Sequence, residues 1–242
     1  MPETFGSVSP YTRPPPGDWQ EILYSGCLTD HWQMNDSERL ALTALLHRHQ
    51  PRCCIEVGTY RAGSLSLIAQ YAKSVFSIDI DPTIPERCSY FDNVSFLTGP
   101  SDVVLPLLFA ELDRQEIAVD LILIDGDHSA HGVRRDLDLV LSYTPKAPLF
   151  VLMHDCFNPE CRRGMLEANW QASKYLRWID LDFIPGRLVE HGGGGNGELW
   201  GGLACVYLEP SERTTPLRVV ESAAQMQSWL ARRSELLRSA VK

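Results

Sequence analysis

The sequence has no long hydrophobic run and no surplus of basic residues. Nowhere do about 18 apolar residues stand together, as a membrane-spanning helix requires, and residues 1–18 lack the basic start and apolar centre of a signal peptide. The chain has 22 Lys and Arg against 31 Asp and Glu, a formal net charge of -9, which argues against a nucleic-acid-binding surface. We therefore expect a cytoplasmic protein without a membrane or nucleic-acid partner.

The cysteines lack the even number and the spacing of a disulfide framework. The seven cysteines are odd in number, and Cys53 and Cys54 are adjacent just before an apolar run. Cys156 and Cys161 have no second pair at zinc-ribbon spacing to accompany them. Reduced thiols in a cytosolic compartment fit this pattern better than a disulfide framework.

The composition is that of a globular protein, with 44% hydrophobic and 22% charged residues. Prolines cluster within residues 1–18, which predicts a non-helical arm. Residues 19–210 are expected to form one α/β domain, and residues 211–242 an amphipathic helix packed on it, with self-association the less expected use of that helix. The apolar stripe of this helix would hold Ala223, Met226, Leu230 and Leu237.

Apolar runs of strand length alternate with helical patterns along the chain. This alternation predicts a Rossmann-like, doubly wound α/β fold with a mostly parallel seven-stranded sheet and an antiparallel pair at one edge. The helix at 35–51 would begin with Asp36 as its N-cap. The other expected helices are 64–72, 103–115, 132–143 and 161–179; the expected strands are 53–58, 75–80, 93–99, 119–125 and 148–155, with the antiparallel pair at 181–184 and 203–208.

Each predicted parallel strand ends in polar or ionisable residues. In an open parallel sheet, the carboxyl ends of the strands line the ligand-binding crevice. Acids often cap a following helix, but five such ends on one edge favour a functional reading. The ends carry Glu56 and Gly58, then Asp79, then Ser101 and Asp102, then Asp125 and His128, and finally His154 and Asp155.

The first turn does not suit a dinucleotide. Gly58 and Gly63 are present, but Tyr60 stands where a dinucleotide fingerprint has a glycine that lets the backbone approach a pyrophosphate. Glu56 would repel phosphate and attract an ammonium or a sulfonium, while Asp79 ends the second strand, where a carboxylate accepts ribose hydroxyls. The turn therefore favours a cationic, phosphate-free nucleoside over NAD.

Four segments together resemble a known family: EVGTYRAGS, SIDIDP, LILIDGDHSAHGVRRDL and the strand ending in HD. They are similar to the class I S-adenosylmethionine-dependent methyltransferases, in the group with macrocin-type sugar O-methyltransferases and cephalosporin-hydroxylase-like proteins. The resemblance covers about residues 32–155 and implies an S-adenosylmethionine site, with Ser101 and Asp102 near the adenine. The implied cofactor residues are Glu56, Gly58, Thr59, Tyr60, Gly63, Ser64, Asp79, Ile80, Ser101, Asp102 and Asp125.

The resemblance also implies a divalent cation, with Mg²⁺ as the expected ion, held by Asp125, His154 and Asp155. His128, three residues after the first of these ligands, matches the catalytic base of the family. A cation and a histidine base suit methyl transfer to an alcohol, because the hydroxyl must lose its proton to become a nucleophile. His154 departs from the family pattern, which has an acid there, and a second base or a hydrogen-bond partner is its alternative role.

The expected function is methyl transfer to a hydroxyl of a small molecule, a sugar or another natural product. A hydroxylation-associated protein and a non-catalytic nucleotide-binding subunit are the alternatives. The sequence leaves three points open: the acceptor, the oligomeric state, for which a homodimer is the base-rate expectation, and the role of the glycine-rich segment 192–197 as a lid or a surface loop.

Overall fold

The computed structural model describes residues 32–189 and 197–240, so the N-terminal arm and most of the glycine-rich segment lie outside the described residues. None of the helices within these two ranges has the length and apolar content needed to cross a bilayer. In chain order, the elements are α2 (Asp36–His49), β1 (Cys53–Val57), α3 (Gly63–Tyr71), β2 (Ser74–Asp79), α4 (Ile84–Arg87), β3 (Val94–Thr98), α5 (Ser101–Arg114), β4 (Leu121–Ile124), α6 (Ala130–Ser142), β5 (Leu149–His154), α7 (Pro159–Glu167), η1 (Trp170–Ala172), β6 (Leu176–Ile184), β7 (Arg187–Val189), β8 (Glu198–Trp200), β9 (Leu203–Leu208), β10 (Val219–Val220) and α8 (Ala224–Ala240).

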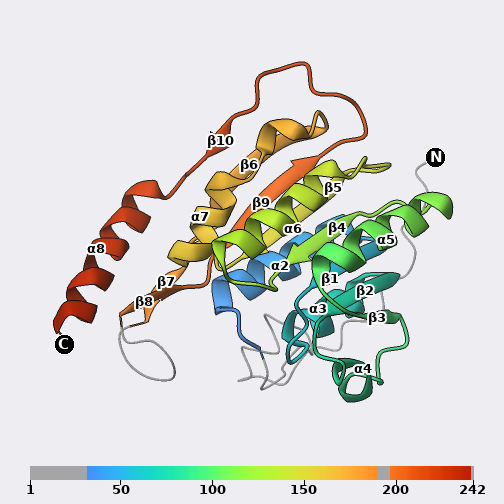
Figure 1. Cartoon of the computed structure of the whole chain (residues 1–242), viewed down its shortest axis with the longest axis horizontal. Helices are drawn as coiled ribbons and strands as arrows, with labels where there is room; N and C mark the ends of the chain where they lie inside the picture. The colour runs from blue at the N-terminus through green and yellow to red at the C-terminus, as the bar shows by residue number, and fades with distance from the viewer. Residues whose placement is uncertain (1–31, 190–196, 241–242) are drawn as a thin grey trace, which may run out of the picture.

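The main sheet has eight strands in the order β10-β6-β9-β5-β4-β1-β2-β3 (Figure 1). Strands β1 to β5 are parallel, and β9 runs antiparallel between β5 and β6. The strand order reverses between β1 and β4, which is where such sheets bind ligands. The predicted fold class is confirmed. The additional strand is the two-residue β10, which pairs with β6.

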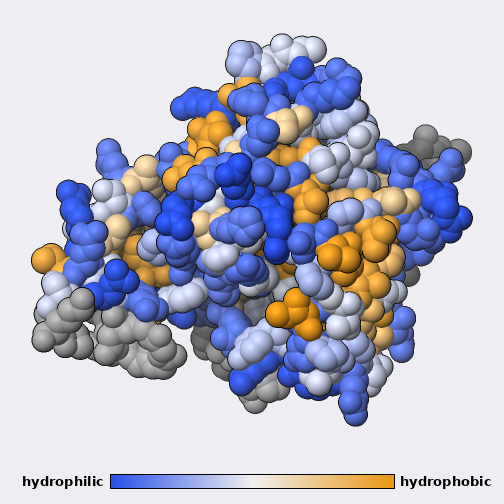
Figure 2. All heavy atoms as spheres, in the orientation of Figure 1, coloured by the Kyte–Doolittle hydropathy of each residue, from blue (hydrophilic) through white to orange (hydrophobic). Residues whose placement is uncertain are grey.

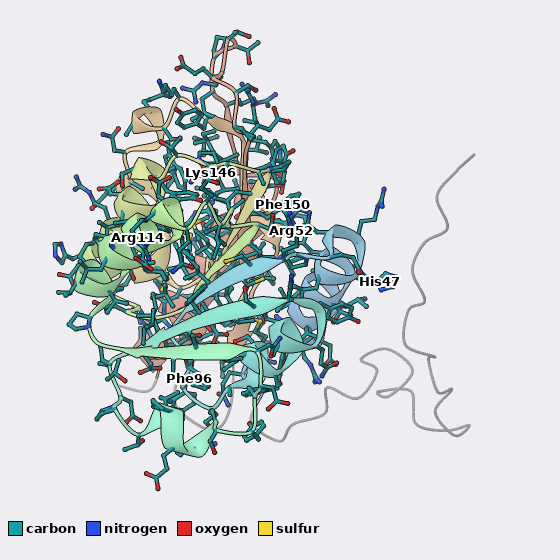
Figure 3. All side chains as sticks on the ribbon, turned by 90° about the vertical axis from the view of Figure 1, so that its right-hand side faces the viewer. His47, Arg52, Phe96, Arg114, Lys146 and Phe150 are labelled. Carbon is teal, nitrogen blue, oxygen red and sulfur yellow. The ribbon has the colours of Figure 1, made fainter. Side chains whose placement is uncertain are left out.

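Helices cover both faces of the sheet. Figure 3 shows α5, which carries Arg114, on one side and α2, which carries His47, on the other. Because side chains alternate along a strand, Cys53 and Ile55 of β1 join the core beneath α5 and α6, while Cys54 joins the core beneath α2 and α3. The face with α5 and α6 is mostly hydrophilic, but Figure 2 shows a hydrophobic patch over α5.

Two local predictions are wrong. The N-cap of α2 is Asn35 rather than Asp36, because its side chain accepts hydrogen bonds from the N–H groups of Ser37 and Glu38. The helix expected over 161–179 ends at Glu167, and β6 begins at Leu176 within that range. Pairing of β6 with β9 buries Leu176 and Ile179 completely, which outweighs the helical pattern of the segment.

The C-terminal helix α8 lies against β7 and β8 at one end of the molecule (Figure 1). Ala223, Leu230 and Leu237 are half-buried, as expected of the apolar stripe, but Met226 is 39% exposed. The side chain of Ser234 is buried and donates a hydrogen bond to the carbonyl of Gly197. The helix therefore packs on the β7–β8 hairpin, and its Leu230 also packs against the main hydrophobic core.

Candidate active site

A cavity of about 1110 Å³ opens at the carboxyl ends of β1, β2, β4 and β5. It brings together most of the residues that the sequence singled out. The exceptions are Glu56, which is buried behind the wall, and Asp102, which lies outside it. The predicted residues on the wall are Gly58, Thr59, Tyr60, Gly63, Ser64, Asp79, Ile80, Ser101, Asp125, His128, His154 and Asp155.

The turn after β1 is tightly wound against the end of β4. Gly58 has φ 91°, and a Cβ there would lie 2.1 Å from the carbonyl oxygen of Asp125. Tyr60 and Ala62 also have positive φ angles, of 47° and 60°, which cost energy in residues with a side chain. The turn thus holds a strained backbone conformation directly beside Asp125.

Glu56 is completely buried beneath this turn. Its Oε1 accepts a hydrogen bond of 2.6 Å from Ser64, but its Oε2 has no hydrogen-bond partner. Burial is the main cause that raises the pKa of Glu56 to about 8, and the nearby charges of Asp125 and Asp79 add to the effect. A buried carboxylate oxygen without a partner is costly, so a cation or donor entering beside it would stabilise the site.

Asp79, at the end of β2, binds the turn itself. Its Oδ2 accepts hydrogen bonds from the N–H groups of Thr59 at 2.8 Å and Tyr60 at 3.0 Å. These are the backbone groups that would have to face a pyrophosphate in a dinucleotide site. Because a carboxylate already takes them, the turn disfavours a phosphate at this position.

The wall after β3 is polar and rigid. Ser101 donates a hydrogen bond of 2.6 Å to the buried Asp136 of α6 and accepts one of 3.1 Å from Arg135. The same guanidinium lies 3.8 Å from Asp102. Burial raises the pKa of Asp136, although Ser101 and Arg135 oppose this.

Asp125, His154 and Asp155 form a cluster whose ligand-type atoms all lie within 4.8 Å of one another. Nδ1 of His154 is 3.0 Å from Oδ1 of Asp125 and 3.4 Å from Oδ2 of Asp155. Burial opposes a charged imidazole, but Asp125, Asp155 and Glu38 outweigh it and raise the pKa of His154 well above its usual value. The donor set of two carboxylates and one imidazole is chemically able to hold a divalent cation.

His128 reaches the same two carboxylates from the cavity side. Its Nε2 lies 3.3 Å from Asp155 and 3.5 Å from Asp125, and its side chain is 44% exposed. The hydrogen bond to Asp125 is the main cause that raises the pKa of His128, while burial opposes the change. The imidazole can therefore accept a proton from a group in the cavity and share the resulting charge with both acids.

Cys156 and Cys161 do not form a thiolate site. Both are buried, and burial raises the pKa of Cys161 to about 12. A thiol that keeps its proton is a poor metal ligand.

The sequence analysis missed Glu38, which lies behind His154. Glu38 is fully buried, and its Oε2 lies 3.2 Å from Nε2 of His154. Its spacing from Asn35 marks a capping box, but its contact with a residue 116 positions away leaves no local signal.

Trp200 and Arg187 were also missed. They are paired neighbours on β8 and β7, so their side chains share a face, and both line the cavity. The Trp200 ring meets that of His128 edge to face, with centroids 5.7 Å apart. An aromatic residue after a run of glycines was the available signal for Trp200.

Three comparisons place this arrangement among known proteins. Residues 36–156, half of the chain, match a family described as a methyltransferase domain. Protein R132 of Acanthamoeba polyphaga mimivirus is 29% identical over 137 residues, which cover 50% of this chain and 62% of the viral protein. The matching part of the chain therefore spans less than two thirds of that relative.

Solved structures share the fold at low sequence identity. The O-methyltransferase TomG from Streptomyces achromogenes, crystallised with SAM and involved in tomaymycin synthesis, has a TM-score of 0.51 at 15% identity, covering 69% of this chain and 78% of its own. Cofactor-bound Rv0187 from MTB has a TM-score of 0.49 at 16% identity, covering 79% of this chain and 88% of its own. The TomG match supports the Rossmann-like fold.

Proposed function

This chain belongs to the methyltransferase-domain family, and from that premise we propose that it transfers a methyl group from S-adenosylmethionine to a hydroxyl of a small molecule. One observation carries the proposal: a single cavity is lined both by the turn after β1 with Asp79 and by the cluster of Asp125, His154 and Asp155. The quoted motifs further favour the group of macrocin-type sugar O-methyltransferases and cephalosporin-hydroxylase-like proteins.

The residues around the first turn fit S-adenosylmethionine. Glu56, whose Oε2 has no partner, bonds through Oε1 to Ser64 on the cavity wall, so a positively charged ligand beside it would reduce the cost of burying this group. Asp79 lines the wall, and since a carboxylate accepts about four hydrogen bonds and this one already accepts from the N–H groups of Thr59, Tyr60 and Asp81, it keeps capacity for about one ribose hydroxyl. When bound, this cofactor supplies a methyl group on a sulfonium, which needs no phosphate-binding amides.

The acidic cluster fits a divalent cation held by Asp125, Asp155 and His154. Carboxylates suit Mg²⁺, but an imidazole nitrogen is a better ligand for Mn²⁺, Co²⁺ or Zn²⁺. When bound, such a cation lowers the pKa of a coordinated hydroxyl and orients it.

His128 is proposed as the catalytic base. Its Nε2 faces the cavity beside Asp125 and Asp155, so a proton taken from the acceptor hydroxyl would be held on that nitrogen between two carboxylates.

The acceptor is proposed to lie against Trp200 and Arg187. The indole offers a flat surface for a sugar or aromatic ring, and Arg187 offers a cation on the same face of the hairpin. Both lie at the end of the cavity that holds His128, which suits a decorated small molecule of the natural-product type. The buried, unpaired thiols of the described chain agree with a proposed cytosolic location.

Calorimetric titration with S-adenosylmethionine and with NAD tests the proposal. We expect binding of S-adenosylmethionine only, and binding of NAD alone would overturn it. Transfer of a labelled methyl group to a panel of glycosylated and polyhydroxylated compounds then tests catalysis. Cofactor binding without transfer to any acceptor would favour a non-catalytic subunit instead.

A further inference from the structure

Glu38 is a carboxylate that the proposed chemistry does not use, although it is fully buried beside the site. Four donors surround it. Its Oε2 lies 2.6 Å from the N–H of Asn35 and 3.2 Å from Nε2 of His154. Its Oε1 accepts from Nδ2 of Asn35 at 2.5 Å and from the N–H of Gly202.

Capping of α2 explains only half of these contacts. The capping box needs Asn35 alone, whereas the contacts with His154 and Gly202 join the start of α2 to the ends of β5 and β9. The pocket is closely fitted, because a Cβ at Gly201 would lie 2.5 Å from Oε1 of Glu38. The carboxylate is therefore held in one orientation.

That orientation keeps a hydrogen on Nε2 of His154. A carboxylate only accepts hydrogen bonds, so Nε2 of His154 must be the donor to Glu38. Nδ1 faces Asp125 at 3.0 Å and Asp155 at 3.4 Å, so by the same rule it carries a hydrogen while no cation is bound. A cation held by both acids would take the place of that hydrogen and bind the lone pair of Nδ1. One ring thus joins Glu38 on one side to two potential metal ligands on the other.

We propose that Glu38 is a positioning residue: it keeps the hydrogen of His154 on Nε2 and so presents Nδ1, with Asp125 and Asp155, to a divalent cation. The inference rests on the cation of the proposed function. It also explains how a histidine can stand where the resembling family has an acid, because the third negative charge is moved behind the ring, to Glu38. An imidazole supported in this way favours Mn²⁺, Co²⁺ or Zn²⁺ over Mg²⁺.

The substitution Glu38→Gln tests this with little change of shape. Each carboxylate oxygen of Glu38 accepts from two donors, but the amide of a glutamine has only one acceptor oxygen, so it can serve only one of these two pairs. If its NH₂ faces His154, the ring must accept there and the hydrogen moves to Nδ1; if it faces Gly202, a buried N–H loses its partner. Either arrangement should weaken cation binding. The expected loss of affinity is about 10- to 100-fold, the usual effect of removing the hydrogen-bond partner of a metal-binding histidine.

Asn35→Ala is the matched control, because it removes the N-cap side chain and its hydrogen bond to Oε1 of Glu38 but leaves the Glu38–His154 contact. We expect calorimetric titration with Mn²⁺ to give near wild-type affinity for Asn35→Ala and the stated loss for Glu38→Gln. Equal affinities for Glu38→Gln and wild type would overturn the proposal. So would an equal loss in Asn35→Ala, or no Mn²⁺ binding by the wild type.

A second measurement needs no variant. In the Zn²⁺-loaded wild-type protein, nitrogen-15 spectra of the histidine rings should show His154 coordinated through Nδ1 with a hydrogen on Nε2. Coordination through Nε2, or no coordination of His154, would overturn the proposal even if Glu38→Gln failed to fold. Titration of the same samples with S-adenosylmethionine separates this outcome from failure of the proposed function, because that cofactor is proposed to bind at the turn after β1 and Asp79, which do not include His154.

Discussion

The backbone of Gly58 passes so close to that of Asp125 that a Cβ at position 58 would lie 2.1 Å from the Asp125 carbonyl oxygen. The clash would be with backbone atoms, which cannot move aside as a flexible side chain can. In addition, φ at Gly58 is 91°, a conformation that residues with a side chain disfavour. We expect Gly58→Ala to lower the free energy of unfolding by at least about 3 kcal/mol. Chemical denaturation monitored by circular dichroism measures this.

Gly126→Ala is the control for this prediction. Its Cβ would lie 3.2 Å from a methyl group of Val57, which can shift slightly. We expect a clearly smaller loss of stability than for Gly58→Ala. Similar losses in the two variants would mean that the close approach at Gly58 is not what requires the glycine.

Glu56 should make the stability of the ligand-free protein depend on pH. Its pKa is about 8 in the folded chain against an ordinary value of 4.5, so the folded state holds this proton more tightly. The resulting stabilisation is complete below about pH 4.5 and is lost as pH rises through about 8. Relative to Glu56→Gln, the free energy of unfolding of the wild-type protein should fall by a few kcal/mol between about pH 4.5 and 8. A difference that stays constant with pH would contradict the prediction.

The same group should couple cofactor binding to pH. If the positively charged sulfonium of S-adenosylmethionine lies beside Glu56, it favours the carboxylate form of Glu56. The affinity of the wild type for S-adenosylmethionine should therefore rise between about pH 6.5 and 8.5. Binding should release a proton, which calorimetry in buffers of different ionisation enthalpy detects. Glu56→Gln should bind more weakly and without this pH dependence. If the affinities of the two proteins for S-adenosylmethionine changed with pH in the same way, the sulfonium would have to bind away from Glu56.

Local patterns in the sequence predicted the residues at the strand ends that line the site, but not the buried residue that supports them from behind. The parallel strands β1, β2, β4 and β5 are apolar runs with buried side chains, and their polar ends follow directly, so Asp79, Asp125 and Asp155 could be placed on one edge. Glu38 could not, since its partners His154 and Gly202 are 116 and 164 residues away. Only the folded chain brings these together.

The region after β5 was predicted less well for a related reason. The strand β6 is defined by its pairing with β9, and the two-residue β10 by its pairing with β6. Neither has a clear alternation of apolar and polar residues over its whole length. The hairpin of β7 and β8 has three residues in each strand, too few for any periodicity. Trp200 lies there, so its place beside His128 follows from long-range packing alone.

His128→Ala tests the proposed base. The side chain is 44% exposed, so its loss should leave stability almost unchanged, while kcat should fall about 10²- to 10⁴-fold because the acceptor hydroxyl keeps its proton. The affinity for S-adenosylmethionine should stay near the wild-type value. His131→Ala is the control, because that histidine is exposed on α6 and does not line the cavity. Parallel losses of turnover and cofactor affinity in His128→Ala would indicate a structural role.

Trp200 should determine how the acceptor binds rather than how the proton is taken. Its ring lies edge to face with that of His128 and faces the cavity, so its removal takes away a flat contact surface next to the proposed base. We expect Trp200→Ala to raise KM for the acceptor about tenfold, the effect of roughly 1.4 kcal/mol of lost contact, with cofactor affinity unchanged. Trp200→Phe should recover most of the affinity, since stacking needs a ring and not the indole N–H, which donates to Glu198. Trp178, partly exposed on β6 and paired with Phe183, provides the control, because Trp178→Ala removes an equal surface away from the cavity. If Trp200→Ala lowered kcat with no change in KM, the ring would be supporting His128, and the acceptor would have to bind against another wall.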